Sequence, residues 1–113
     1  MKALLILASL VAGTAAAAQP VMVIADAPRT ERVSFADLDL TSAAGVGALQ
    51  DRVRTAATRL CIEDGVQPLS VKLAGKACFN AAYADGLDQV SQAVDARRAG
   101  VAIAGAAVSV RGQ

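Results

Sequence analysis

The sequence predicts an α+β domain, in which a short N-terminal β-hairpin is followed by a disulfide-linked α-helical hairpin. Three observations lead to this fold class. Two short apolar runs with extended pattern precede residue 41, two longer stretches carry apolar residues at helical spacing, and the two cysteines stand near the junction of those stretches. A last apolar run at the C-terminus is either an extra strand that joins the hairpin or a loose tail.

Residues 1–18 have the features of a signal peptide. Lys2 supplies a minimal positive region, residues 3–12 form a short apolar segment, and Ala16 and Ala18 are small residues of the kind that a signal peptidase reads. The alternative is a membrane anchor, which needs about 20 strongly apolar residues. This run is shorter and rich in alanine, so we expect cleavage after Ala18 and no membrane span in the mature chain.

The mature chain, residues 19–113, is expected to be one small domain that is periplasmic or secreted. Lys2 is one of the 11 basic residues, so ten remain against ten acidic residues. This balance indicates neither a nucleic acid nor an acidic membrane as partner. The sequence has no histidine, which excludes a hydrolase with a histidine base and, if the cysteines are bonded, a zinc site. We expect no enzymatic activity and no cofactor.

Two extended segments are expected before the first helix. Residues 21–24 (VMVI) are apolar and mostly β-branched, and residues 32–40 resume the extended pattern after a turn-prone loop. Val33 and Phe35 share one face of the second segment, whereas the two leucines that follow fall on the other face by parity. This slip in phase predicts a bulge or the end of the strand near residues 36–37.

The first helix is expected to begin after Thr41 or Ser42 and to end at Cys61. Either hydroxyl could accept a hydrogen bond from a free backbone N–H of the first turn. Apolar residues at steps of three and four form one buried stripe; they are Val46, Leu49, Val53, Ala56 or Ala57, and Leu60. Gly45 and Gly47 weaken the first turns by up to about 1 kcal/mol each relative to alanine.

A connection over residues 62–75 is expected next. Gly65 and Pro68 are typical of turns and loops. Val71 and Leu73 alternate with polar neighbours, which indicates a brief extended piece.

The second helix is expected to run from Gly75 or Lys76 to Arg98. Its apolar residues again follow helical spacing; they are Phe79, Ala82 or Tyr83, Leu87, Val90 and Val94. Gly86 is a weakness in mid-helix, and Gly100 is the expected stop.

The tail, residues 99–113, contains an uncharged run over residues 101–110 (VAIAGAAVSV). Ten residues are far too few to cross a membrane. The β-branched residues of the run favour a late strand over a loose tail.

Cys61 and Cys78 are the only cysteines. Export to an oxidising compartment favours an internal disulfide over free thiols or an intermolecular bond. We expect Cys61 in the last turn of the first helix and Cys78 in the first turn of the second, where the ends of a helical hairpin meet. Such a bond stabilises by about 3 kcal/mol. A structural role is favoured over thiol–disulfide exchange, since redox cysteines usually stand two residues apart at a helix start.

Asp37 and Asp39 are the candidate interaction residues. They alternate on the predicted strand, and paired carboxylates can perform acid–base chemistry or hold a hard cation. No third ligand stands near them in the sequence. The plainer interpretation is a solvated strand face before a helix N-terminus, where negative charge is favourable.

The arginines of the two helices are expected on solvated faces, balanced by aspartates. The arginines are Arg52, Arg54, Arg59, Arg97 and Arg98, and the aspartates are Asp51, Asp88 and Asp95.

One block of the sequence resembles a known family. The segment from Phe35 to Leu40 reads aromatic-x-Asp-Leu-Asp-Leu, and a helix with Arg52–Val53 and Leu60–Cys61 follows. Together with the signal peptide and Cys78, the block resembles the UrcA family of small exported bacterial proteins. The resemblance spans about residues 21–94, so the tail lies outside it.

The resemblance supports export and the disulfide, and it supplies no catalytic residues. The family often has Arg–Ile at the position of Arg52–Val53, and Cys–Gly at the position of Cys61–Ile62. The turn after the first helix is therefore expected to differ from the family pattern.

We expect a non-enzymatic envelope or secreted protein that binds a protein or envelope partner. Asp37, Asp39 and the faces of the helices would form its interaction surface. The alternative is a periplasmic carrier of a small ligand or cation that uses the same two aspartates.

Overall fold

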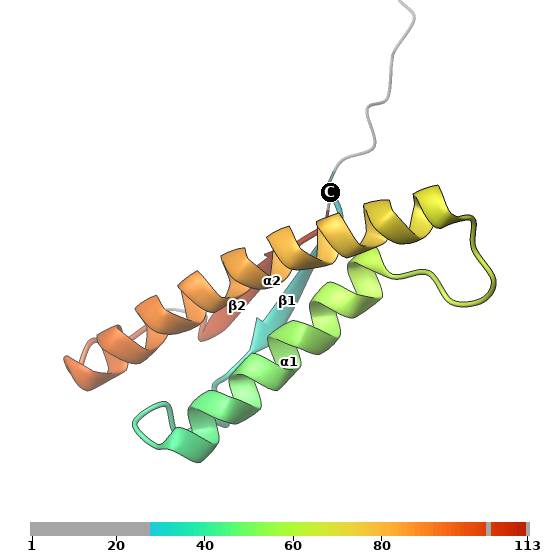
Figure 1. Ribbon diagram of the computed structural model, residues 1–113. Helices are drawn as coiled ribbons and strands as arrows, with labels where there is room; N and C mark the ends of the chain where they lie inside the picture. The colour runs from blue at the N-terminus through green and yellow to red at the C-terminus, as the bar shows by residue number, and fades with distance from the viewer. Residues whose placement is uncertain (1–27, 104, 113) are drawn as a thin grey trace, which may run out of the picture.

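The computed structural model describes residues 28–103 and 105–112, which form two helices and a two-stranded sheet. The α+β class and the disulfide between the helices are confirmed. Figure 1 shows the two helices side by side on one face of the sheet. In chain order the elements are β1 (Thr30–Ser34), α1 (Ala43–Cys61), α2 (Leu69–Arg98) and β2 (Ala107–Arg111).

The sheet joins the two ends of the described chain. β1 pairs with β2 in antiparallel register, with Arg32 opposite Ser109. The predicted C-terminal strand is therefore confirmed, at residues 107–111. The other predicted partner of β1, residues 21–24, lies outside the described residues.

The second predicted strand, residues 32–40, is wrong beyond Ser34. β1 ends there, and a turn occupies the residues up to the helix. The slip in phase has this cause: Phe35 and Leu40 are both buried, although their parity differs, because the chain turns between them. Leu38 N–H donates to Phe35 O at 3.0 Å within this turn.

α1 begins and ends as predicted. Ser42 is the N-cap, and its hydroxyl accepts from Gly45 N–H at 3.0 Å. The buried residues of α1 include Leu49, Val53 and Ala57, which confirms the predicted stripe. α1 packs on both strands and on α2.

α2 begins earlier than predicted, at Leu69 instead of Gly75. The predicted extended piece at Val71 and Leu73 is wrong, because both residues lie in the first turns of the helix. Pro68 occupies the N-cap position, and its carbonyl accepts from the N–H groups of residues 71 and 72 at 3.1 Å each. Proline with its fixed φ is well suited to a helix start, so it opens this helix instead of interrupting it.

The end of α2 agrees with prediction. The helix ends at Arg98, and Gly100 has a φ of +73°, a left-handed conformation that glycine adopts without steric cost. Val101 N–H donates to Ala96 O at 2.9 Å, which closes the helix as in a Schellman motif.

The core lies between the two helices and the inner face of the sheet. Its members are small or branched, which suits a domain this short. They are Val33, Phe35, Leu40, Leu49, Val53, Ala56, Ala57, Ala82, Val90, Ala93, Val94, Val108 and Val110.

Two glycines of α2 permit close contact with α1. A Cβ at Gly86 would collide with Cγ1 of Val53, and a Cβ at Gly75 would lie 2.7 Å from Cys61 O. Gly86, expected to be only a weakness of the helix, is thus where the two helices approach each other.

Side chains from the helices engage the outer edges of the sheet. Gln89 of α2 donates through Nε2 to Ser109 O at 2.7 Å and accepts through Oε1 from Ser109 N–H at 3.0 Å. Arg52 of α1 donates to Ser34 O at 2.9 Å. These bonds tie each helix to the strand beside it.

Candidate functional site

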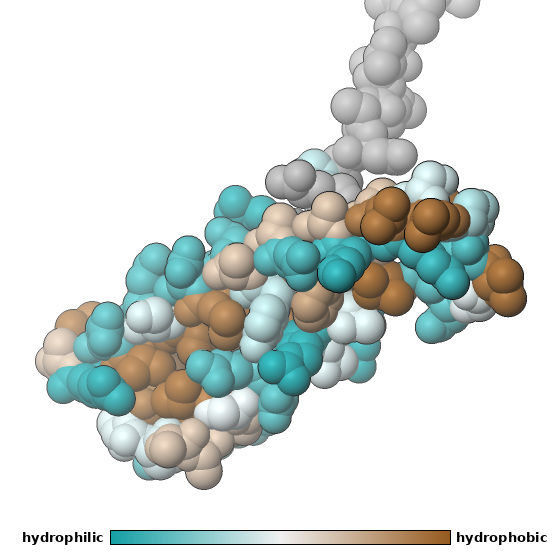
Figure 2. Space-filling model, in the orientation of Figure 1, coloured by the Kyte–Doolittle hydropathy of each residue, from teal (hydrophilic) through white to brown (hydrophobic). Residues whose placement is uncertain are grey.

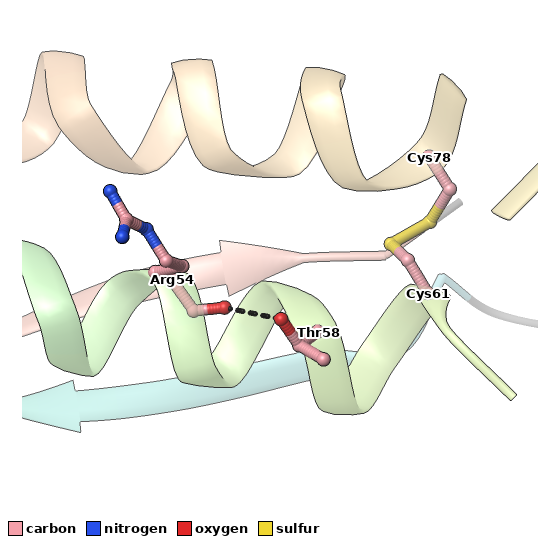
Figure 3. The surroundings of a disulfide bond; sticks show 4 residues. All are labelled: Arg54, Thr58, Cys61 and Cys78. Carbon is pink, nitrogen blue, oxygen red and sulfur yellow. Dashed lines mark hydrogen bonds between the residues drawn. A yellow bond between two sulfur atoms is a disulfide. The ribbon is translucent and has the colours of Figure 1, made fainter. Parts of the chain in front are cut away.

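The disulfide joins the end of α1 to the third turn of α2. The Cα atoms of Cys61 and Cys78 are 5.5 Å apart, within the range that a disulfide requires. Figure 3 shows the bond beside the last turns of α1, where Thr58 Oγ1 donates to Arg54 O at 3.0 Å. Cys61 lies where predicted, whereas Cys78 does not lie in the first turn, because α2 begins at Leu69.

Residues 69–77, which we call the overhang, are the part of α2 that precedes Cys78. No residue of the overhang is buried. Figure 1 shows that it extends past the end of α1. The exposed large apolar side chains of the described chain concentrate here and in the loop before it; they are Ile62, Val66, Leu69, Val71 and Leu73, and only Val101 lies elsewhere. Figure 2 shows these hydrophobic residues gathered over the start of α2 and its loop.

The overhang has two different faces. Successive residues of a helix are rotated by about 100°, so Val71, Gly75 and Cys78 share one face. All three line a pocket against the end of α1. Leu69, Leu73 and Lys76 share the opposite face and do not line that pocket.

The pocket beside the disulfide has a volume of about 630 Å³. Leu60, Ile62 and Val71 supply apolar lining next to the bonded cysteines. The charged side chains of the lining are three cations and one carboxylate: Arg29, Arg59, Lys72 and Glu63. The pocket therefore combines an apolar wall with an excess of positive charge.

The cations of the pocket differ in their partners. Arg59 Nη1 lies 3.2 Å from Glu31 Oε1, so part of its charge is already compensated. Arg29 and Lys72 form no ion pair with any other described residue. Both can therefore turn toward a negatively charged ligand without breaking an existing bridge.

Asp37 lies in the turn after β1 and not on a strand, contrary to the sequence-based prediction. Arg52 binds both of its oxygens, at 2.8 Å from Nη1 and 2.6 Å from Nη2. The hydrogen bonds from Arg52 are the main cause that lowers the pKa of Asp37 from 3.8 to about 2. Asp37 thus ties the turn to α1.

Asp39 serves the approach to α1. Its Oδ1 accepts from the Thr41 hydroxyl at 2.5 Å and from Thr41 N–H at 2.9 Å, and these bonds lower the pKa of the carboxyl. Both predicted interaction residues are therefore engaged by their own neighbours. Within residues 28–103 and 105–112, no three His, Cys, Asp or Glu side chains are grouped so that they could hold a metal ion.

The arginines of α1 have partners other than the expected aspartates. Arg52 and Arg59 pair with Asp37 and Glu31. Arg54 lies over the ring of Tyr83, 5.4 Å from its centroid, and donates to its hydroxyl at 3.3 Å. These contacts link α1 to β1, to the turn and to α2, so the arginines are bonded across elements.

Comparison with protein-family models, with curated proteins and with solved structures finds no match to this chain. In the described part of the chain, no helix is both long and apolar enough to cross a membrane. The pocket was not predicted from the sequence, because residues 71–75 were assigned to a connection instead of a helix. The one signal for it was the unusual density of apolar residues around Pro68.

Proposed function

We propose that this protein is exported and acts by binding rather than by catalysis. The predicted signal peptide, the resemblance to the UrcA family and the disulfide each support export, since disulfides persist in oxidising compartments. Periplasmic fractionation of a Gram-negative host tests this part of the proposal. The expected product begins at Gln19, and a full-length product confined to the cytosol would contradict export.

The pocket beside the disulfide is the proposed binding site, and an anionic amphiphile with an alkyl chain is its proposed ligand. One observation supports this choice: apolar residues and three cations line the same cavity. The volume of about 630 Å³ lies within the range of small-molecule sites, roughly 300–1,000 Å³. An alkyl chain would cover Leu60, Ile62 and Val71, while the head group meets the cations.

Lys72 and Arg29 would provide most of the attraction for the head group. Neither is engaged in an ion pair with a described residue, whereas Arg59 already contacts Glu31. An exposed charge pair contributes up to about 1 kcal/mol, which is about fivefold in affinity. The apolar contact adds affinity for the chain without regard to the charge of the head group.

Calorimetric titration with dodecanoate, below its micellar concentration, tests the ligand class. We expect the oxidised protein to bind dodecanoate more tightly than dodecyltrimethylammonium, and Lys72→Met to weaken dodecanoate binding about fivefold. Lys76→Met is the matched control, because Lys76 is on the same helix but does not line the pocket. Equal affinity for the two amphiphiles, or equal effects of the two substitutions, would contradict the proposal.

A further inference from the structure

The face of the overhang that points away from the pocket carries its own apolar surface. Leu69 and Leu73 are 70% and 59% exposed, although both stand on a regular helix. Val66, in the loop before them, is fully exposed. Contiguous apolar surface of this kind is typical of interaction sites, whereas single exposed side chains are ordinary.

Charges of opposite sign lie at the two ends of this surface. Lys76 follows the leucines on the same face of α2, and Asp64 precedes them in the loop. The ion pairs among the described residues are Arg52–Asp37 and Arg59–Glu31, so neither Lys76 nor Asp64 is paired there. The start of α2 also has no side-chain cap and no acidic residue in its first turn, which leaves its positive dipole end uncompensated.

A surface with an apolar centre, an acidic end and a basic end is complementary to itself. In an isologous contact about a twofold axis, the same patch of each copy faces the other in the reverse direction. The leucines then meet across the axis. Asp64 of each copy comes to the basic end of the other, near Lys76, and close to a helix start that favours negative charge.

We infer that a second copy of this chain docks on the surface formed by Asp64, Val66, Leu69, Leu73 and Lys76. The pocket for the proposed ligand lies on the opposite face of α2, so this contact does not depend on the proposed function. The apolar centre is small compared with the roughly 800 Å² per partner of a standard interface. The dimer is accordingly weak and reversible, with a dissociation constant on the order of 100 µM.

Sedimentation equilibrium of the oxidised protein between 10 µM and 1 mM tests the inference. We expect the mean mass to rise from that of one chain toward that of two, and Leu69→Asp combined with Leu73→Asp to keep the protein monomeric throughout. Val101→Asp is the matched control, because Val101 is 55% exposed and lies after the other end of α2. Unchanged circular dichroism confirms that each variant is folded.

Charge reversal tests the orientation of the two copies. We expect Lys76→Glu to weaken the dimer, and Asp64→Lys in the same chain to restore it, because the pair is then inverted. A monomer at 1 mM, a dimer that survives the two leucine substitutions, or equal loss with Val101→Asp would each overturn the inference. Failure of the double reversal to restore the dimer would overturn the proposed orientation.

Discussion

The two halves of α2 are held in place by different forces. From Ala82 to Val94 the helix places a small or branched residue in the core at every turn, and Gly86 allows α1 to approach closely. In the overhang no side chain is buried, and the leucines are exposed. Cys78 stands between the halves and bonds to the last residue of α1.

This difference separates stability from recognition within one helix. The packed half buries its apolar surface within the domain and so contributes to folding. The overhang leaves its apolar surface in contact with solvent, which costs stability and is understandable if a ligand or a second copy covers it. The disulfide allows this division, because it fixes the base of the overhang without a packed core around it.

Loss of the disulfide should have the largest effect on the comparison. Cys61→Ser combined with Cys78→Ser is expected to lower the free energy of unfolding by about 3 kcal/mol, because the unfolded chain loses its cross-link. Urea denaturation measures the change. Reductant should lower the midpoint of the unmodified protein and leave that of the double variant unchanged; an unmoved midpoint in the unmodified protein would refute the role of the bond.

Gly86→Ala tests the packed half. A Cβ there meets Val53, whose branched side chain has little freedom to move, so we expect a loss of about 1–3 kcal/mol in unfolding free energy. Gly47→Ala is the control, because nothing lies within 4 Å of a Cβ at Gly47. Alanine should stabilise α1 at that position by about 0.5–1 kcal/mol. If both substitutions stabilise in thermal melts, the close contact of the helices is wrong.

The helix starts also differ, and Ser42→Ala measures that difference. Ser42 caps α1 through its hydroxyl, whereas Pro68 offers α2 no side-chain cap. We expect Ser42→Ala to cost about 1 kcal/mol in chemical denaturation. Ser70→Ala, at an exposed site in the first turn of α2, should change stability by less than about 0.5 kcal/mol. A similar cost at both positions would contradict the assigned cap.

Acid should weaken the link between the turn after β1 and α1. The folded-state pKa of Asp37 is lowered from 3.8 to about 2, so its contribution is present above pH 3.8 and is lost as the pH falls toward 2. Asp37→Asn should reduce this acid-dependent loss in melts recorded between pH 5 and pH 2. Asp88→Asn serves as the control, since Asp88 forms no ion pair with the described residues; a pH profile unaltered by Asp37→Asn would contradict the assignment.

Sequence reasoning predicted α1 because its signals are local and agree. The cap at Ser42, the apolar stripe and the terminal Cys61 all fall on one continuous segment. The start of α2 was missed because Pro68 and Gly75 usually interrupt helices. Here the proline opens the helix, and the glycine is needed where the carbonyl of Cys61 approaches.

Features that depend on distant contacts were harder to predict. The pairing of β1 with β2 joins segments at opposite ends of the described chain, and no local pattern fixes such a register. The pocket exists only because the overhang is helical and turns Val71 toward α1. The roles of Asp37 and Asp39 depended on a turn that the phase slip near residues 36–37 had indicated, although the sequence placed both on a strand.

Hydrogen exchange along α2, recorded in the oxidised and reduced protein, tests the difference between its halves most directly. We expect the amides of residues 82–94 to exchange slowly in the oxidised protein and those of residues 72–77 to exchange faster. Reduction should remove the remaining protection of residues 72–77, while residues 82–94 keep the protection set by global unfolding. Uniform protection along α2 in both redox states would contradict the account.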